Sequence, residues 1–321
     1  MNYKPIIIVA GEPNSIFLEI FFKTFKLKKF KSPLILIASK EIVNFQMKAL
    51  NFKLKINLLD FNGKSLSKLY KNKINLINVD FHQTKAFDKI SFRSKKYIEK
   101  SFDTALNLIK LNISEKLLNG PISKKHFLKK KFFGITEYLG EKTKSKNVSM
   151  LIYNKYLSVS PLTTHIPLKS VSKKITKKYI VDKILLINEF YKKKLNFLPK
   201  IAVTGLNPHC ESTSLLNEDK QILLPSIRIL KNKNLIIDGP FPTDTIFLKQ
   251  NRNKFDLIIG MYHDQVLTPI KTIYEYDAIN ITIGLPFIRV SPDHGPNTKM
   301  IGKNLSNPLS LIRSLEFLDY K

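Results

Sequence analysis

The chain has 321 residues, of which 54 are Lys or Arg and 25 are Asp or Glu, so its formal net charge is +29. Hydrophobic residues make up 43% of the chain, and no apolar run approaches the roughly 20 residues of a membrane span, which excludes wholesale disorder and a helical membrane protein. A single cysteine, Cys210, excludes an internal disulfide and a cysteine-rich zinc site. Short β-rich runs then alternate with helical stretches along the chain. We expect strands at 5–10, 33–38, 74–79, 115–119, 201–205, 235–238, 255–260 and 278–284, and helices at 16–25, 93–111, 171–193, 217–230 and 305–318.

The positive charge is nearly all lysine, spread in short runs, and the chain has only five arginines. Base-reading and phosphate-clamping sites favour arginine, so this pattern indicates a solvated surface rather than a nucleic-acid track. A basic nucleic-acid-binding protein nevertheless remains an alternative, and the same field would attract an anionic small molecule. The first strand follows the N-terminus too closely for a signal peptide, so we expect a cytoplasmic protein with no membrane partner.

The alternation of strands and helices favours a largely parallel sheet, in which functional residues lie in loops past the carboxyl ends of strands. Three of these loops carry a histidine, namely His165, His209 and His263. Imidazole binds zinc, cobalt and related ions, and three histidines with an open position form a catalytic metal site. The histidines are 44 and 54 residues apart, so spacing alone equally allows three separate loop residues with local hydrogen bonds. We interpret His82 and His126 in this second way.

Further polar residues follow the third histidine. Lys271, Asn280 and Arg289 are spaced by nine residues and offer cationic and amide donors suited to a phosphate or a carboxylate. Lys271 can equally be an ordinary surface lysine. That interpretation is weaker for Arg289, because arginine is scarce in this chain. Asp244 has two interpretations, because Thr243 or Asp244 can cap a helix over 245–249 and a carboxylate there can also take part in chemistry.

Several sequence motifs strongly resemble the 4-hydroxythreonine-4-phosphate dehydrogenases of the vitamin B6 pathway. The resemblance spans essentially the whole chain and is most specific from 239 to 295. The motifs are 119–124 (NGPISK), 136–139 (TEYL), 165–168 (HIPL), 207–209 (NPH), 239–245 (GPFPTDT), 261–265 (MYHDQ), 280–289 (NITIGLPFIR) and 293–295 (DHG).

The resemblance implies an α/β fold of the isocitrate/isopropylmalate dehydrogenase type, with two α/β domains and a cleft between them. We expect one domain to comprise 1–130 and 295–321, and the other, 131–294, to carry the metal-binding histidines and the dimer interface. The resemblance also implies a homodimer with its active site at the interface, and NAD, or NADP, as the oxidant. A divalent zinc, magnesium or cobalt ion would be bound by histidines from both subunits, namely His165, His209 and His263. The phosphorylated substrate would be held by Thr136, Lys271, Asn280 and Arg289.

The implied reaction is the oxidation of 4-phosphooxy-L-threonine at C3, followed by decarboxylation to 3-amino-2-oxopropyl phosphate, in pyridoxal and pyridoxine 5'-phosphate biosynthesis. A divalent ion would lower the pKa of the substrate hydroxyl and polarise the ketone. Asp244, Asp264 and Lys271 are candidates for proton transfer or for orienting a metal-binding histidine, and the sequence does not choose among them. It also leaves open the native metal and the preference between NAD and NADP.

The chain departs from the family pattern in two places. The family motif Gly-Asp-Pro-Ala-Gly-Ile-Gly-Pro-Glu appears at 11–19 as GEPNSIFLE, with Glu12 in place of Asp and two glycines lost. Ile135 stands where the family has a histidine that contacts the substrate. The loss of this hydrogen-bond donor weakens substrate binding by on the order of 1 kcal/mol, or it signals another substrate.

Two other enzymes therefore remain as alternatives. The first is a sister dehydrogenase acting on a different four-carbon 4-phospho acid, such as threonate or erythronate 4-phosphate. The second is a phosphate acyltransferase on a related fold, which would need no histidine-bound metal. No Gly-x-Gly-x-x-Gly fingerprint is present, so the residues that bind the nicotinamide cofactor are not assigned.

Overall fold

The computed structural model describes residues 3–60, 66, 68–128, 132, 134–211 and 217–320. The chain forms two compact units, Met1–Phe132 with Pro286–Lys321, and Phe133–Leu285. The chain thus returns to the first unit at 286, whereas the sequence-based division places this return at 295. The difference arises because β12 (Ile288–Pro292) pairs in parallel with β5 (Lys116–Asn119) of the first unit. Arg289, which lies on β12, therefore belongs to the first unit.

The first unit is built on a parallel sheet. Its strands are β1 (Ile6–Val9), β2 (Leu34–Ala38), β3 (Ile56–Leu59), β4 (Ile74–Asn78), β5 and β12, and they follow the order β3-β4-β2-β1-β5-β12. Every neighbouring pair in this order is parallel. β1 and β2 consist of apolar residues that are buried throughout, as expected for strands covered on both faces.

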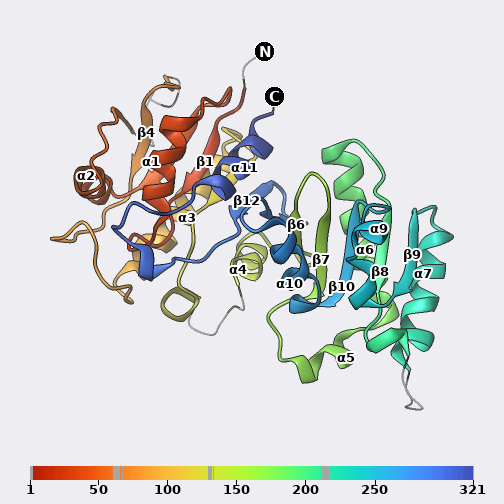
Figure 1. The fold of residues 1–321 in the computed structure, drawn as a ribbon. Coiled ribbons are helices and arrows are strands. Elements are labelled where there is room, and N and C mark those ends of the chain that lie inside the picture. The colour runs from red at the N-terminus through yellow and green to blue at the C-terminus, as the bar shows by residue number, and fades with distance from the viewer. Residues whose placement is uncertain are drawn as a thin grey trace. The chain divides into compact units, whose positions relative to one another are not determined.

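Helices cover both faces of this first sheet. They are α1 (Phe17–Leu27), α2 (Lys40–Ala49), α3 (Ser94–Lys110) and α11 (Leu309–Leu318). α1 contacts both α2 and α11, and Figure 1 shows α1 and α11 side by side. The crossover from β4 through α3 to β5 runs across the sheet in the opposite direction to the one from β1 through α1 to β2. Because such crossovers are right-handed, α3 lies on the other face.

Glu12 is a buried carboxyl group at the carboxyl end of β1, with 2% of its surface exposed. Its Oε2 accepts a hydrogen bond from Ser94 Oγ at 2.9 Å, and its Oε1 accepts one from the Asn14 backbone N–H at 3.4 Å. Burial raises the pKa of the Glu12 carboxyl, although these two hydrogen bonds partly oppose the shift. The native state therefore disfavours the ionised form of this side chain.

A Glu12→Gln variant should be more stable than the wild type at neutral pH. A carboxyl whose pKa is raised on folding lowers stability as the pH rises from the ordinary glutamate range through the folded-state pKa. The stability difference between variant and wild type should grow over that range, by about 1.4 kcal/mol for each unit of raised pKa. Urea unfolding of both proteins from pH 4 to 8 measures this, and a difference that is constant with pH would contradict it.

The second unit is built on a mixed sheet. Its strands are β6 (Ser149–Tyr153), β7 (Ser158–Thr163), β8 (Ile201–Thr204), β9 (Ile237–Phe241), β10 (Leu257–Tyr262) and β11 (Ile279–Ile283), and they follow the order β11-β6-β7-β10-β8-β9. β6 pairs antiparallel with both β11 and β7. The expected parallel arrangement holds from β7 through β10 and β8 to β9. The carboxyl ends of these four strands therefore lie along the same edge of the sheet.

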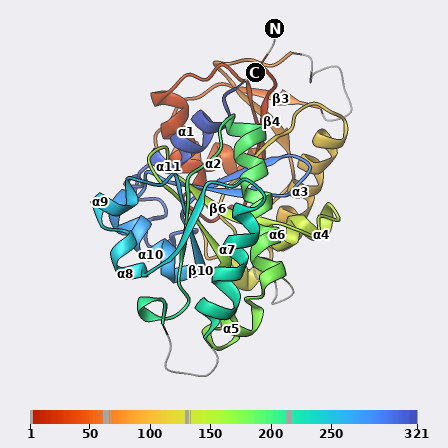
Figure 2. The ribbon, with the colours of Figure 1, turned by 90° about the vertical axis from the view of Figure 1, so that its right-hand side faces the viewer.

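The helices of the second unit are α4 (Ile135–Lys142), α5 (Val171–Lys174), α6 (Lys177–Phe190), α7 (Leu224–Lys231), α8 (Thr243–Ile246), α9 (Lys249–Arg252) and α10 (His263–Tyr274). Figure 2 shows α8, α9 and α10 on one side of β6 and β10, and α6 and α7 on the other. α10 packs Val266, Leu267 and Ile270 onto β7 and β10, where they join Val159 and Ile258 in one apolar cluster. This packing fixes α10, whose first residue is His263.

Most of the expected strands and helices are confirmed, but the helix expected over 171–193 is wrong as a continuous element. It breaks at Ile175, which is extended and buried, and Thr176 then caps α6 by accepting a hydrogen bond from the Tyr179 backbone N–H at 3.2 Å. The last helix begins at Leu309, directly after Pro308, rather than at 305. The strands that are not expected from the sequence are β3, β6, β7 and β12. Within the described ranges, no helix combines the length and the apolar character that crossing a membrane requires.

Candidate active site

The three histidine loops follow three neighbouring parallel strands of the second unit. His165 comes two residues after β7, His263 directly after β10, and His209 in the loop after β8. β10 lies between β7 and β8 in the sheet. The strand order therefore places the three loops at one edge, although the histidines are far apart in sequence. His263 stands where β10 passes directly into α10.

Two of the imidazoles lie close together within one chain. The ring centroids of His165 and His263 are 5.6 Å apart. Below them, Thr163 Oγ1 donates a hydrogen bond to the backbone carbonyl of Met261 at 2.7 Å, which ties the two strand ends together. His263 Nδ1 is 2.6 Å from Asp264 Oδ1. This contact engages Nδ1 and leaves Nε2 as the nitrogen that can face a ligand, which is how carboxylates orient metal-binding histidines.

His209 lies in a loop with unusual backbone geometry. His209 has φ +55° and Cys210 has φ +60°, so two consecutive non-glycine residues adopt the left-handed conformation. Such geometry persists only where the surroundings hold it. Among the described residues of one chain, no group of three or more His, Cys, Asp or Glu side chains lies close enough to hold a metal ion. The shared three-histidine site therefore remains a prediction.

Negative charge surrounds the loop of His209. Burial raises the pKa of the neighbouring Cys210 thiol to about 11, and the charges of Asp219, Asp244 and Glu211 act in the same direction. Asp244 therefore lies near this loop, because it follows β9 and the loop follows β8, and these two strands are neighbours in the sheet. A thiol with this pKa stays protonated at neutral pH and is a poor metal ligand or nucleophile.

The expected cap by Thr243 or Asp244 is not found. α8 begins at Thr243, two residues earlier than expected, and its N-cap is Pro242 without a side-chain hydrogen bond. Thr243 Oγ1 instead accepts a hydrogen bond from Gln265 Nε2 at 3.0 Å. Asp244 is exposed in the first turn of α8, so its side chain is available for another role.

Two of the residues proposed for substrate binding lie at β11. Thr136, on α4, lies 3.1 Å from Thr282 on β11, as measured between their Oγ1 atoms. Asn280 and Thr282 are two residues apart on the strand and therefore point to the same face. Among the described residues, Asn280 Oδ1 is shielded from solvent and has no hydrogen-bond partner. A buried amide of this kind requires an explanation, and a ligand is one.

Lys271 lies two helical turns after His263 on α10. His263, Leu267 and Lys271 are spaced by four residues and share one face of the helix. Together with Thr268 and Thr272 they line a surface hollow of about 440 Å³. Lys271 itself is exposed. The hollow thus combines an imidazole, hydroxyl groups and an ammonium group, which are suited to a phosphorylated ligand, with the exposed carboxylate of Asp264.

Arg289 lies on β12 of the first unit and has only 1% of its surface exposed. Its Nε donates a hydrogen bond to Asn119 Oδ1 at 2.7 Å, and Asn119 is itself buried at the end of β5. The same Asn119 side chain donates to the Gly120 carbonyl at 2.8 Å. The guanidinium is therefore held in one orientation at the carboxyl end of β5.

Glu137 is a polar residue near His165 that the sequence analysis assigns no role. A Cβ atom added at Gly134 would lie 3.1 Å from Glu137 Oε2 and 3.1 Å from His165 Cε1, so glycine keeps the space between them open. Among the described residues, Glu137 Oε2 is buried without a hydrogen-bond partner. The motif that contains Thr136 and Glu137 was the only sequence signal for this residue. Ile135, the substituted position, is the first residue of the same helix.

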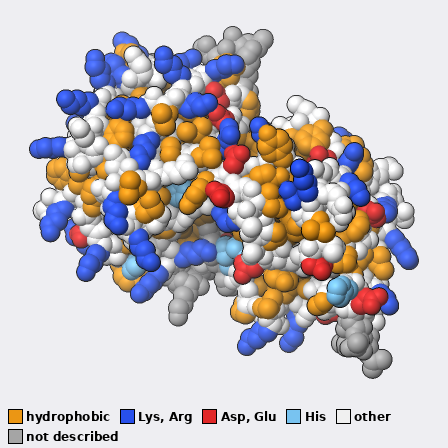
Figure 3. All heavy atoms as spheres, viewed as in Figure 1, with side chains coloured by type: hydrophobic (Ala, Val, Ile, Leu, Met, Phe, Trp, Pro, Cys, Tyr) orange, Lys and Arg blue, Asp and Glu red, His pale blue; other side chains and the backbone are white. Residues whose placement is uncertain are grey.

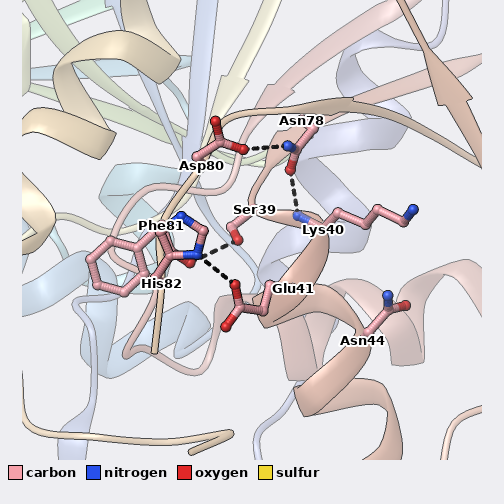
Figure 4. Close-up of a pocket in the computed structure, with 8 residues that line it drawn as sticks. All are labelled: Ser39, Lys40, Glu41, Asn44, Asn78, Asp80, Phe81 and His82. Carbon is pink, nitrogen blue, oxygen red and sulfur yellow. Dashed lines mark hydrogen bonds and ion pairs between the residues drawn. The ribbon is translucent and has the colours of Figure 1, made fainter. Parts of the chain in front are cut away.

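A second hollow, of about 320 Å³, lies in the first unit past the carboxyl ends of β2 and β4 (Figure 4). His82 Nδ1 contacts Glu41 Oε2 at 2.9 Å, and Ser39 Oγ donates to the Phe81 carbonyl at 3.1 Å. In the same unit, His126 Nδ1 lies 2.8 Å from Ser123 Oγ. The interpretation of His82 and His126 as residues with local hydrogen bonds is therefore confirmed.

Lysine and arginine side chains are scattered over the face of the molecule that Figure 3 shows, with neutral and hydrophobic side chains between them. Some lysines pair with nearby acids, such as Lys23 with Glu19 at 2.9 Å. This distribution matches the solvated surface that the sequence indicates.

Comparisons with known proteins agree with this fold. A family model described as "Pyridoxal phosphate biosynthetic protein PdxA" matches residues 29–318. A 4-hydroxythreonine-4-phosphate dehydrogenase from Sulfurihydrogenibium sp. is 36% identical over 315 residues, which are 96% of this chain and 95% of that protein. A crystal structure of a 4-hydroxythreonine-4-phosphate dehydrogenase from Burkholderia phymatum is 25% identical and covers 100% of both chains, with a TM-score of 0.78.

A likeness of fold alone extends further. The crystal structure of isocitrate dehydrogenase from Methylococcus capsulatus is 10% identical, covers 98% of this chain and 84% of that chain, and has a TM-score of 0.50. The chain therefore has an α/β fold like that of isocitrate dehydrogenase, and the matches to 4-hydroxythreonine-4-phosphate dehydrogenases define it as a dehydrogenase. It belongs to the family of the pyridoxal phosphate biosynthetic protein PdxA. The resemblance inferred from the motifs and the fold class that it implies are both confirmed.

Proposed function

We propose that this protein oxidises 4-phosphooxy-L-threonine at C3 with NAD, or with NADP, and that the product loses its carboxylate. Hydride passes from C3 to the nicotinamide, the C3 hydroxyl loses a proton, and the resulting β-keto acid releases carbon dioxide to give 3-amino-2-oxopropyl phosphate. Membership of the family supports the reaction, because its relatives bear the name of this dehydrogenase. The observation that carries the proposal at the site is the approach of His165 and His263 at adjacent strand ends.

The donor set of the second unit fits a divalent cation. His165 and His263 supply imidazoles, His209 lies in the loop after the neighbouring strand, and Asp264 contacts His263 Nδ1. A zinc, magnesium or cobalt ion bound there would supply Lewis-acid chemistry at the substrate oxygens. The resemblance to the family adds a homodimer in which both subunits contribute ligands. Asp264 orients its neighbouring histidine in this proposal.

The remaining site residues would bind and orient the substrate. Lys271 and Thr136 offer an ammonium and a hydroxyl group to the phosphate, and Asn280 offers a buried amide that lacks a partner among the described residues. The resemblance alone adds the Arg289 guanidinium to this set. Fixing the phosphate at a distance from C3 aligns the reacting hydrogen and lowers the entropic part of the barrier. Asp244 and Lys271 remain the candidates for moving the C3 hydroxyl proton.

The test is a spectroscopic assay of the purified protein. We expect NADH formation from 4-phosphooxy-L-threonine that disappears after treatment with a chelator and returns on addition of zinc, magnesium or cobalt. Detection of 3-amino-2-oxopropyl phosphate by mass spectrometry completes the test. Absence of NADH formation with each metal and each cofactor would overturn the proposal.

Ile135 favours a second candidate function. At the first turn of α4 it replaces the family histidine next to Thr136, and an isoleucine side chain donates no hydrogen bond. A sister dehydrogenase of threonate or erythronate 4-phosphate would not need recognition of the amino group. A panel of these acids separates the two functions, because the true substrate should have the highest kcat/KM. An Ile135→His variant should shift the ratio toward 4-phosphooxy-L-threonine.

A further inference from the structure

Gln265, the third residue of α10, uses the whole hydrogen-bonding capacity of its side chain. Its Nε2 donates to the Gly205 carbonyl at 2.7 Å and to Thr243 Oγ1 at 3.0 Å. Its Oε1 accepts from Thr204 Oγ1 at 2.9 Å and from the Met261 backbone N–H at 2.6 Å. A carboxamide has two N–H groups and two acceptor positions, so all four are occupied.

The four partners of Gln265 lie at or just past the carboxyl ends of three adjacent parallel strands. Thr204 ends β8 and Gly205 follows it, Met261 belongs to β10, and Thr243 begins the helix that follows β9. Gln265 has 7% of its surface exposed, so these hydrogen bonds lie in a largely dry environment. A fully satisfied buried network fixes its members in one arrangement, and the loss of one partner is costly. The side chain therefore clamps the strand ends that precede His209 and His263.

The loop of His209 has a second anchor in Asp219, which is 1% exposed. Asp219 Oδ1 accepts a hydrogen bond from the Leu206 backbone N–H at 2.8 Å, and Oδ2 accepts one from Asn207 Nδ2 at 2.9 Å. A Cβ atom at Gly205 would lie 2.9 Å from Asp219 Oδ1, so only glycine allows this close approach. Gln265 holds the start of the loop from one side and Asp219 from the other. His209, with its left-handed conformation, lies two residues after Asn207 in this anchored loop.

We propose that Gln265 is a positioning residue that fixes the loop of His209 and the strand end before His263, so that both imidazoles are presented for metal binding. The metal-binding part of this proposal rests on the proposed metal-dependent function. The expected rigidity of the loop of His209 does not depend on that function. Gln265 touches neither substrate nor metal and acts through the two histidines. Its effect on metal binding should therefore depend on the presence of His209.

Hydrogen–deuterium exchange of the metal-free protein is the first test. The Gln265→Met variant keeps a similar side-chain volume and removes all four hydrogen bonds. Exchange should accelerate at least about tenfold in peptides that cover 205–211 and remain unchanged in peptides that cover 164–168. The control is Gln250→Met, the same substitution at an exposed glutamine on α9. Unchanged exchange at 205–211 would overturn the proposal, and so would equal acceleration throughout the second unit.

Zinc affinity, measured by titration against a competing chelator, is the second test. Gln265→Met should weaken zinc binding about 10-fold to 100-fold, the range found for residues that orient metal ligands. In a His209→Ala background the same substitution should weaken zinc binding less than in the wild type, because only the part of its effect that acts through His263 remains. An equal loss in both backgrounds would mean a general structural role and would overturn the proposal.

The two tests separate the failure of this inference from the failure of the proposed function. If the wild type binds no zinc, cobalt or magnesium, the proposed function fails and the exchange experiment alone decides the role of Gln265. If Gln265→Met does not fold, Thr243→Val removes a single partner of Nε2 and should give the same exchange pattern with a smaller acceleration. No acceleration at 205–211 in that folded variant would contradict the inference.

Discussion

Replacing His263 with alanine is expected to lower kcat/KM by roughly 1,000-fold or more and to abolish tight zinc binding. A Lewis acid at the reacting oxygens is worth several kcal/mol of transition-state stabilisation, and about 1.4 kcal/mol corresponds to a factor of ten. His263 is the central ligand candidate, because β10 lies between the strands that lead to His165 and His209. Steady-state kinetics and zinc titration of the purified variant measure both effects.

The matched control for this variant is His82→Ala. His82 also contacts a carboxylate through Nδ1, at 2.9 Å from Glu41, but it lies in the first unit and is highly exposed. Its loss should leave the kinetics and the zinc affinity within a factor of about two, since exposed pairs contribute little. A His263→Ala variant that behaves like this control would remove His263 from the site.

Replacing Arg289 with lysine is expected to lower kcat/KM for the phosphorylated substrate about 100-fold, mostly through a higher KM. Lysine keeps the positive charge but loses the planar fork that binds phosphate with two hydrogen bonds. Hydrogen bonds to charged groups contribute about 1.5–3 kcal/mol each. Zinc affinity should stay unchanged, because Arg289 lies on β12 of the first unit and the three histidines lie in the second.

A purely structural role for Arg289 makes a different prediction. The guanidinium is buried against Asn119, so loss of that hydrogen bond alone would lower the melting temperature without raising KM. Arg93→Lys is the control, since Arg93 is exposed and its guanidinium donates to the His82 carbonyl. A folded Arg289→Lys variant with unchanged KM and a lower melting temperature would show that the arginine serves stability alone.

Composition and periodicity predict much of the fold because the strands are unusually apolar. Runs such as those at Ile6–Val9 and Leu34–Ala38 are buried on both faces, which identifies them without tertiary information. β6 and β12 escape prediction because their mixed sequences derive their strand character from pairing with distant partners. The break at Ile175 also depends on tertiary burial, which overrides a helical pattern.

The candidate site is only partly visible in the sequence for a similar reason. Spacings of 44 and 54 residues between the histidines carry no metal motif, and only the strand order reveals that their loops are neighbours. The family motifs nominate the histidines and the phosphate-binding residues. They do not identify Gln265 or Asp219 as anchors, because those roles consist of contacts with residues that are far away in the chain.

Anomalous X-ray diffraction at the zinc edge, from crystals of the zinc-loaded protein, tests the central claim most directly. We expect one zinc peak per chain, about 2.0–2.1 Å from nitrogen atoms of His165, His209 and His263, contributed by the two subunits of a dimer. A zinc peak at other side chains would contradict it. A fully loaded crystal in which the three imidazoles lie beyond bonding distance of every metal ion would contradict it equally.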